Sequence, residues 1–169
     1  AIDPADSATV PKAVAAAVAS TAFLVPYALS RSTSPTPDHP RVLLWYAALR
    51  KPFFKPPDVA VPLAWTAIES GLAVAAYRLL RGPPSRARAS ALGWLAANVV
   101  GIGAWSRLFF GRRNLPASTV AAGALCAAGA VYTVRAREVD GVAGAAGIPL
   151  TAWVAFATVL TAALWRRNR

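Results

Sequence analysis

The sequence predicts an all-α integral membrane protein, a bundle of five transmembrane helices. Of the 169 residues, 56% are hydrophobic and only 15% are charged, too few to cover a folded protein of this size in water. Five apolar runs approach the roughly 20 residues that a helix needs to cross about 30 Å of hydrocarbon. None has the alternating pattern of a membrane β-strand, so each is expected to satisfy its backbone hydrogen bonds as a helix.

The predicted membrane helices divide the chain into a short lead and one membrane domain. Residues 1–12 are expected to be a flexible lead, and residues 13–169 to form the domain. The first run is the shortest and follows Lys12, so a secretory signal peptide is the competing interpretation of that segment. The five predicted helices are residues 13–29, 59–80, 89–110, 115–134 and 142–165.

The long connection over residues 30–58 is predicted to act as a lid. Its Arg41–Arg50 segment wraps an apolar stripe around a short helix, which would lie at the membrane interface or fold over the mouth of the bundle. Lys51-Pro52 should end this helix, because proline lacks an N–H donor and disfavours helix in the residue before it. Pro56-Pro57 then predicts an extended entry into the next helix. The alternative to a lid is that the aromatic residues of this connection form a belt at the level of the lipid headgroups.

The net charge of +11 is spread over the predicted loops, so it indicates membrane orientation and not a nucleic-acid partner. Eleven of the 18 Lys and Arg residues fall on one predicted side, with the lid loop and the C-terminus, and seven on the other. The positive-inside rule therefore predicts a cytoplasmic lid and C-terminus. The abundance of alanine and arginine suggests a GC-rich genome, so we expect the protein in a bacterial cell membrane. A eukaryotic organelle membrane is the alternative.

The residues that usually carry catalysis or bind metal are sparse. Cys126 lies inside an apolar run, where a lone thiol usually packs as a small hydrophobe, and His39 lies in a proline-rich loop. The sequence shows no metal-ligand cluster, no glycine-rich phosphate loop and no Ser/His/Asp arrangement. No catalytic residue and no required cofactor are predicted.

The stretch from Trp45 to Trp65 carries an ordered set of motifs. It reads Trp45-Tyr46-x-x-Leu49-x-Lys51-Pro52, then Pro56-Pro57, then Pro62-x-x-Trp65-Thr66. This order resembles the TspO/MBR family, the translocator proteins or peripheral-type benzodiazepine receptors, over about residues 13–168. Later matches are Trp105-Ser106, Phe109-Phe110-Gly111, Asp140, Ala143, Gly144, Pro149, Trp153, residues 157–160, Trp165, Arg166 and Asn168.

The resemblance implies a cavity within the bundle, roofed by the first loop, that binds tetrapyrroles such as protoporphyrin IX and haem. Aromatic faces suit a planar macrocycle, and Arg50, Lys51 and Lys55 could meet its carboxylates. Ordinary core packing is the alternative for each single aromatic residue. The expected ligand-binding residues are Trp45, Tyr46, Lys51, Phe53, Phe54, Pro62, Trp65, Thr66, Glu69, Asn98, Trp105 and Trp153.

The chain departs from the family pattern at polar pocket positions. Glu69 and Leu150 stand where the family usually has tyrosine, and Ile102 stands where asparagine is common. Ala162 and Ala163 replace the aromatic residue of a sterol-associated pattern, so sterol binding through that pattern is not expected. A carboxylate such as Glu69 in mid-helix usually faces a cavity or bundle interior. It is expected to line the pocket, with a structural hydrogen bond or an ion pair to Arg107 as alternatives.

Small residues recur every four positions on the third predicted helix, at Ala89, Gly93, Ala97 and Gly101. Such a strip lets two helices approach closely, and it predicts the seam of a homodimer. Packing against another helix of the same chain is the alternative.

Three functions are consistent with these residues. The leading one is a membrane receptor or binding protein that regulates or transports tetrapyrroles or related lipophilic molecules. A second is an enzyme-like role in which light or oxygen degrades porphyrin beside Trp65 and Trp153. A third is a structural or interaction protein whose pocket has decayed.

Overall fold

The computed structural model describes residues 9–169, and within them it contains six α-helices, a short π-helical segment and no strand. Most of the predicted lead, residues 1–8, lies outside the described residues. The elements are α1 (Lys12–Arg31), α2 (Pro40–Ala48), α3 (Ala60–Arg81), α4 (Arg86–Ser106), the π-helical segment (Arg107–Gly111), α5 (Leu115–Arg137) and α6 (Gly141–Arg167).

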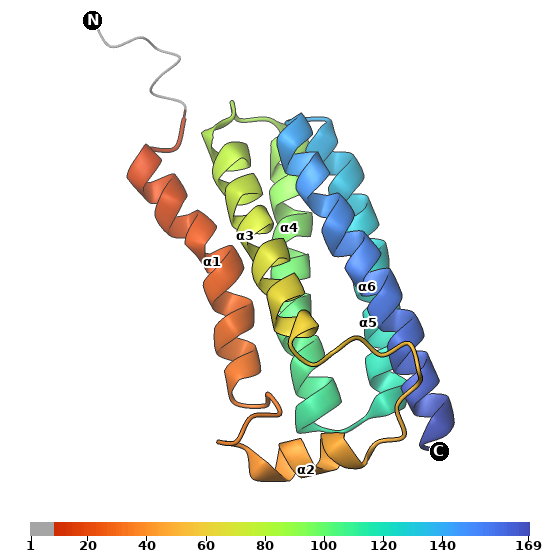
Figure 1. The fold of residues 1–169 in the computed structure, drawn as a ribbon. Coiled ribbons are helices and arrows are strands. Elements are labelled where there is room, and N and C mark those ends of the chain that lie inside the picture. Colours follow the sequence, from red (N-terminus) through yellow and green to blue (C-terminus); the bar gives the residue numbers. More distant parts are fainter. Residues whose placement is uncertain (1–8) are drawn as a thin grey trace, which may run out of the picture.

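The five long helices run side by side as a bundle, and α2 lies across one end of it (Figure 1). Helices α5 and α6 form the most extensive pair, while α1 packs on α3 and α4. Ala15, Ala19 and Ala22 of α1 are buried in this packing, so α1 is part of the bundle. The all-α bundle is confirmed, and each long helix agrees with a predicted one to within a few residues except at the end of α4.

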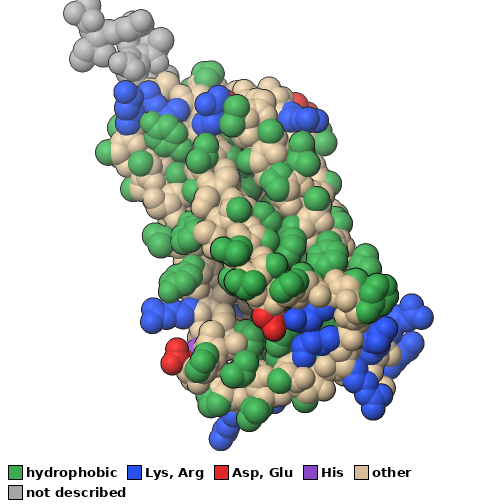
Figure 2. Space-filling view, in the orientation of Figure 1, with side chains coloured by type: hydrophobic (Ala, Val, Ile, Leu, Met, Phe, Trp, Pro, Cys, Tyr) green, Lys and Arg blue, Asp and Glu red, His purple; other side chains and the backbone are tan. Residues whose placement is uncertain are grey.

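Four of the long helices, α1, α3, α5 and α6, are long and apolar enough to cross a membrane by length and composition. The remaining one, α4, has 21 residues and packs in the same bundle, but glycines, tryptophans and Asn98 lower its mean hydropathy. Figure 2 shows Lys and Arg gathered at the two ends of the molecule, with hydrophobic side chains over the middle. This distribution is that of a protein that spans a membrane.

Side-chain caps fix where three of the helices begin. The Ser85 hydroxyl accepts from the Arg88 N–H, the Asn114 amide oxygen from the Ala117 N–H, and the Asp140 carboxylate from the Ala143 N–H. Each cap satisfies a backbone donor that the first turn leaves free. These caps explain why α4, α5 and α6 begin just after a polar residue.

Two helix ends differ from the prediction. Helix α2 ends at Ala48, earlier than expected, because Leu49 already has extended backbone angles. The third membrane helix was expected to continue to residue 110, but α-helical geometry stops at Ser106 and the chain continues as the π-helical segment. Arg113 then adopts a positive φ of 53°, which turns the chain sharply into α5.

Close contact between α5 and α6 depends on glycine. A Cβ atom added to Gly144 would lie 2.9 Å from both the Cα and the backbone nitrogen of Arg137, so no larger residue fits without moving the helices apart. Tyr132 is fully buried at the same contact and donates its hydroxyl to the Ala143 carbonyl oxygen at 2.9 Å. This end of the hairpin is therefore tightly packed.

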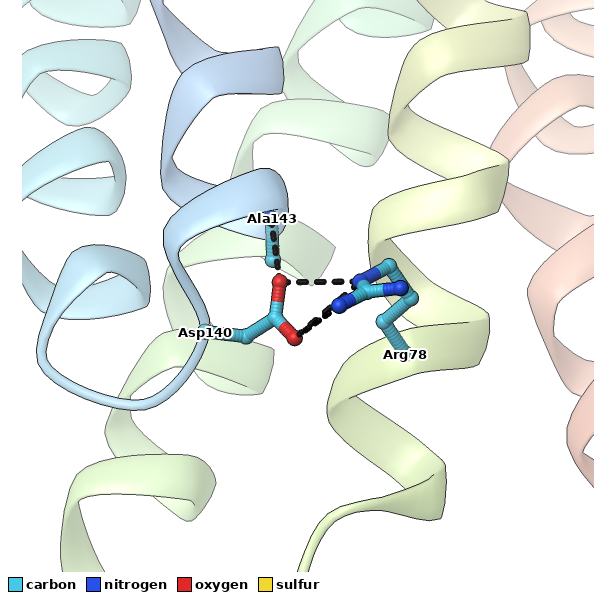
Figure 3. A network of polar contacts seen from close by, with 3 residues as sticks. All are labelled: Arg78, Asp140 and Ala143. Atoms are coloured by element: carbon cyan, nitrogen blue, oxygen red, sulfur yellow. Dashed lines mark hydrogen bonds and ion pairs between the residues drawn. The ribbon is translucent and has the colours of Figure 1, made fainter.

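An ion pair joins α3 to the start of α6 at the end of the bundle opposite α2 (Figure 3). The Arg78 guanidinium donates to both carboxylate oxygens of Asp140, with N–O distances of 2.8 to 3.0 Å. The same carboxylate caps α6 through Ala143. The Arg78 guanidinium holds the pKa of Asp140 below its ordinary value, and the backbone N–H groups add to this effect.

Candidate functional site

The bundle encloses a cavity of about 850 Å³ at the end covered by α2. The volume lies within the range of about 300 to 1,000 Å³ that is typical of small-molecule sites. All five long helices, α2 and the segment between α2 and α3 contribute to the walls. The lining is mostly apolar, with a small number of polar groups.

Tryptophans from three helices form the aromatic walls of the cavity. Trp65 of α3 meets Trp153 of α6 edge to face, with ring centroids 6.4 Å apart and planes at 86°. Trp105 of α4 stacks on Phe109 at 5.0 Å and donates its indole N–H to the Ser118 carbonyl oxygen. Because neighbouring rings fix their orientation, these faces are preorganised to stack against a planar ligand.

Helix α2 closes the cavity through aromatic contacts with the π-helical segment. Trp45 packs edge to face on Phe109, and Tyr46 packs in the same way on Phe110, each with centroids 5.7 Å apart. The guanidinium of Arg113 lies over the Trp45 ring and donates to the Arg41 carbonyl oxygen at 3.2 Å. Burial raises the pKa of Tyr46, and nearby Asp58 raises it further. The predicted lid is therefore a helix anchored by rings.

The lid loop is also bound to the end of α6. The Arg50 N–H donates to the Asn168 amide oxygen at 2.9 Å, and the Asn168 amide nitrogen donates back to the Arg50 carbonyl oxygen at 3.2 Å. The same nitrogen donates to the Leu164 carbonyl oxygen. Since Leu164 lines the cavity, this contact joins the lid to the α6 wall.

The two lysines of the lid have different surroundings. The Lys51 ammonium donates to the carbonyl oxygens of Tyr46, Ala47 and Leu49, so it caps the end of α2. Burial lowers the pKa of Lys51; Lys55 lowers it further and Asp58 opposes the shift. The Lys55 ammonium pairs with the exposed Asp58 carboxylate at 2.6 Å.

Comparison with known proteins agrees with this architecture. The sequence profile of the TspO/MBR family matches residues 13–166, nearly the whole chain. The chain belongs to the TspO/MBR family. It is 30% identical to the translocator protein of Homo sapiens over 132 residues, covering 77% of this chain and 78% of that protein.

Microbial members of the family are similarly related. The chain is 31% identical to the tryptophan-rich protein TspO of Archaeoglobus fulgidus over 130 residues, covering 75% of this chain and 82% of that protein. It is 28% identical to the tryptophan-rich sensory protein of Cereibacter sphaeroides over 124 residues, covering 73% and 77%. The matches establish a TspO-family membrane protein.

Most of the predicted ligand-binding residues of this TspO-family chain come together at the cavity. Others do not line the cavity: Trp45 lies within the aromatic anchor of the lid, Phe53 is 95% exposed, and Phe54 packs against the lining residue Phe156. The predicted residues that line the cavity are Tyr46, Lys51, Pro62, Trp65, Thr66, Glu69, Trp105 and Trp153.

Asn98 was expected at the site, but the structure places it outside the cavity lining. It is fully buried between α4 and α5, and its amide nitrogen donates to the Trp94 carbonyl oxygen. Among residues 9–169 its Oδ1 atom has no hydrogen-bond partner, and it lies near the Gly129 backbone. The family position lies one turn later on the helix, where Ile102 does line the cavity.

Glu69 lies at the cavity wall, as expected, and only 8% of it is exposed. Neither alternative expectation is met within the described residues. Its carboxylate makes no hydrogen bond there, and Arg107, the predicted ion-pair partner, lies exposed at the lid end of the bundle. The carboxylate therefore faces the cavity without a partner from the described chain.

Several residues that line the cavity were not predicted from the sequence. Phe23 and Tyr27 of α1 lie one turn apart and face the cavity, as does Phe156 on α6, whose ring centroid is 5.6 Å from that of Trp153. Helical spacing of three or four residues between aromatic side chains could have indicated them. Asn168 is one of the residues that match the family pattern, but nothing in the sequence indicates Arg50 as its partner.

The predicted small-residue seam on α4 is mostly open. Ala89, Gly93 and Ala97 are exposed, and no atom of the described residues lies within 4 Å of a Cβ atom added at Gly93. Gly101 differs, because an added Cβ atom would lie 2.8 Å from Leu125 of α5. The fourth member of the strip thus packs inside the chain, while the other three face outward.

Proposed function

We propose that this TspO-family protein is a membrane receptor that binds tetrapyrroles, such as porphyrin or haem, or related lipophilic molecules, and so senses or transports them. The observation that carries the proposal is the cavity of about 850 Å³ with tryptophans from three helices. Its walls offer ring faces to a planar apolar ligand, and the lid can retain that ligand.

The charge at the lid end suits a ligand with acidic groups. Lys55 lines the cavity, and only 15% of its side chain is exposed. Its partner Asp58 is 78% exposed, so a ligand carboxylate could replace a carboxylate that is largely in water. The names of two relatives, translocator protein and tryptophan-rich sensory protein, support a translocating or sensing role.

Protoporphyrin IX titration of the purified protein in lipid nanodiscs tests this proposal. Quenching of tryptophan fluorescence should saturate with a one-to-one ratio. Trp65→Phe and Trp153→Phe should each weaken binding by about threefold to tenfold, because each removes part of a stacking face. Trp94→Phe is the matched control, since Trp94 lies on α4 with 37% exposure and does not line the cavity.

The outcomes separate the candidate functions. Saturable quenching without a new product supports binding. A new bilin-like absorption band under light and oxygen would support the enzyme-like alternative. Quenching that does not saturate, or that weakens equally in Trp94→Phe, would contradict the proposal and favour a decayed pocket.

The open face of α4 supports a homodimer as part of this proposal. Ala89, Gly93 and Ala97 would let a second copy approach closely in the membrane. Nothing in the described chain contacts the Gly93 position, so Gly93→Leu should leave the monomer intact and abolish cross-linked dimer in native membranes. Unchanged cross-linking would remove this seam from the proposal.

The orientation proposed from the loop charges places the lid and the C-terminus in the cytoplasm. The lid and the C-terminus do lie at the same end of the bundle (Figure 1). Labelling of a cysteine introduced at Arg169 by a membrane-impermeant reagent tests the proposal. Labelling only after membranes are opened supports it, and labelling of intact cells contradicts it.

A further inference from the structure

The inner end of the cavity is apolar except for one carboxylate. Its deepest walls are made by Ile102 of α4, Leu125 of α5, and Trp153 and Val154 of α6. Glu69 lies at this level on α3, about 14 Å along the helix from its first residue. The lid therefore stands at one end of the cavity and the carboxylate at the other.

The other charged groups that line the cavity are already satisfied near the lid. Lys51 donates to three backbone carbonyl oxygens, and Lys55 pairs with Asp58. Within the described residues, no cation is within ion-pair distance of Glu69. The chain thus leaves this carboxylate to be partnered by whatever enters the cavity.

A carboxylate inside a membrane bundle is costly unless it meets a proton, a cation or a hydrogen-bond donor. A ligand nitrogen that carries hydrogen supplies such a partner, and an ammonium group supplies charge as well. A ligand carboxylate at the same place would face a like charge or compete for one proton. A ligand N–H group is therefore favoured next to Glu69, and a ligand carboxylate is favoured away from it.

We propose that Glu69 makes the inner end of the cavity select lipophilic ligands that carry a nitrogen N–H donor, an ammonium group above all, and turns the carboxylates of a ligand toward the lid. The inference rests on the proposed function, because it names the ligand chemistry taken by the same cavity. A ligand with both kinds of group binds with its nitrogen at Glu69 and its acid groups near Lys55.

Three pyrene probes of nearly equal size test this selection: pyrenylbutylammonium, pyrenylbutanol and pyrenylbutyrate. Energy transfer from tryptophan to pyrene reports binding to the full chain in nanodiscs of zwitterionic lipid. The wild type should prefer the ammonium probe to the alcohol by at least about tenfold, as expected for a hydrogen bond to a charged group, and the carboxylate probe should bind most weakly. Glu69→Gln should bring the ammonium and alcohol probes within about twofold.

Glu138→Gln is the matched control, because Glu138 is an exposed carboxylate at the far end of the bundle, paired with Arg135. It should leave the ammonium preference unchanged. An equal loss in Glu138→Gln, or an ammonium preference that survives in Glu69→Gln, would overturn the proposal. If Glu69→Gln fails to fold, the wild-type series decides, since equal binding of ammonium and alcohol probes also overturns it.

Protoporphyrin IX titrated into the same samples separates this inference from the proposed function. Porphyrin binding without ammonium preference sinks the role of Glu69 and leaves the receptor proposal standing. Ammonium preference without porphyrin binding supports the role of Glu69 and contradicts the proposal that the cavity binds porphyrin. If neither ligand binds, both proposals fail.

Discussion

The backbone of Arg50 and the side chain of Asn168 exchange two hydrogen bonds, although 118 residues separate them along the chain. One belongs to the lid loop and the other follows the last turn of α6. No residue of α2 is fully buried, so this pair adds to the ring contacts of Trp45 and Tyr46 in holding the lid closed. The lid is therefore expected to open more often when this pair is broken.

Asn168→Ala should make the lid more accessible to trypsin at the Arg50–Lys51 bond. Loss of the pair costs about 1 kcal/mol, which corresponds to roughly fivefold faster cleavage if cleavage follows local opening. The rate is measured by mass spectrometry of the fragments. Arg169→Ala, next to the pair and exposed, is the control and should leave the rate unchanged. Equal rates in Asn168→Ala and the wild type would show that the pair does not hold the lid.

The left-handed backbone at Arg113 gives a second prediction about the lid. Arg113→Ala and Arg113→Gly both remove the contacts to Trp45 and Arg41, but only glycine adopts a φ of 53° without strain. The glycine variant should therefore be more stable than the alanine variant by about 1 kcal/mol, or roughly 3 °C in melting temperature. Thermal unfolding in detergent, followed by intrinsic fluorescence, measures the difference. The reverse order would contradict the strain argument.

The Arg78–Asp140 pair should make stability depend on pH. Asp140 has a pKa below its ordinary value of 3.8, chiefly because Arg78 hydrogen-bonds to the carboxylate. The carboxylate thus stabilises the fold fully above that value and loses this contribution as the pH falls through the lower pKa of the folded state. Asp140→Asn keeps a capping side chain but lacks the charge.

Melting temperatures of the wild type and of Asp140→Asn check this prediction. The wild type should be the more stable protein near pH 6, and the difference should shrink as the pH falls below about 3.8. Arg78→Gln should reduce the same difference near pH 6, since it removes the partner of the ionised carboxylate. A gap between wild type and Asp140→Asn that does not change with pH would mean that the charge of Asp140 is unimportant.

Glycine at the α5–α6 contact is expected to be essential for packing. Gly144→Ala brings a Cβ atom to 2.9 Å from backbone atoms of Arg137, which no side-chain rotation relieves. The melting temperature should fall by several degrees, corresponding to about 2 kcal/mol of overpacking. Gly141→Ala is the control in the same helix and should be close to neutral, because no atom of the part of the chain that the structure describes lies within 4 Å of its added Cβ.

The sequence was informative about the elements because lipid imposes long apolar helices with a clear length. The membrane helices could be predicted for this reason, and the short α2 helix from its apolar stripe and the proline that follows it. The ends of α2 and α4 could not, because the extended backbone at Leu49 and the π-helical turn at Arg107 depend on contacts made in the folded bundle.

The site was predictable to the extent that helical position fixes which side chains share a face. Trp65 was expected at the pocket from its motif and Glu69 because a mid-helix carboxylate usually faces a cavity; they lie one turn apart on α3, and both line the cavity. Residue type alone did not reveal the role of Lys51, because a lysine can bind a ligand carboxylate as well as it can cap a helix. Asn98 was misplaced because it lies one turn further from the lid than Ile102, about 6 Å along α4, which puts it beyond the inner end of the cavity and against α5.

The walls of the cavity come from distant parts of the chain, with Trp65 on α3 facing Trp153 on α6. During synthesis the first half of the chain therefore enters the membrane without a binding site. The pocket is completed only when the last helix has been inserted and Asn168 reaches the lid. A complete cavity thus requires that the last helix of the described chain has been inserted.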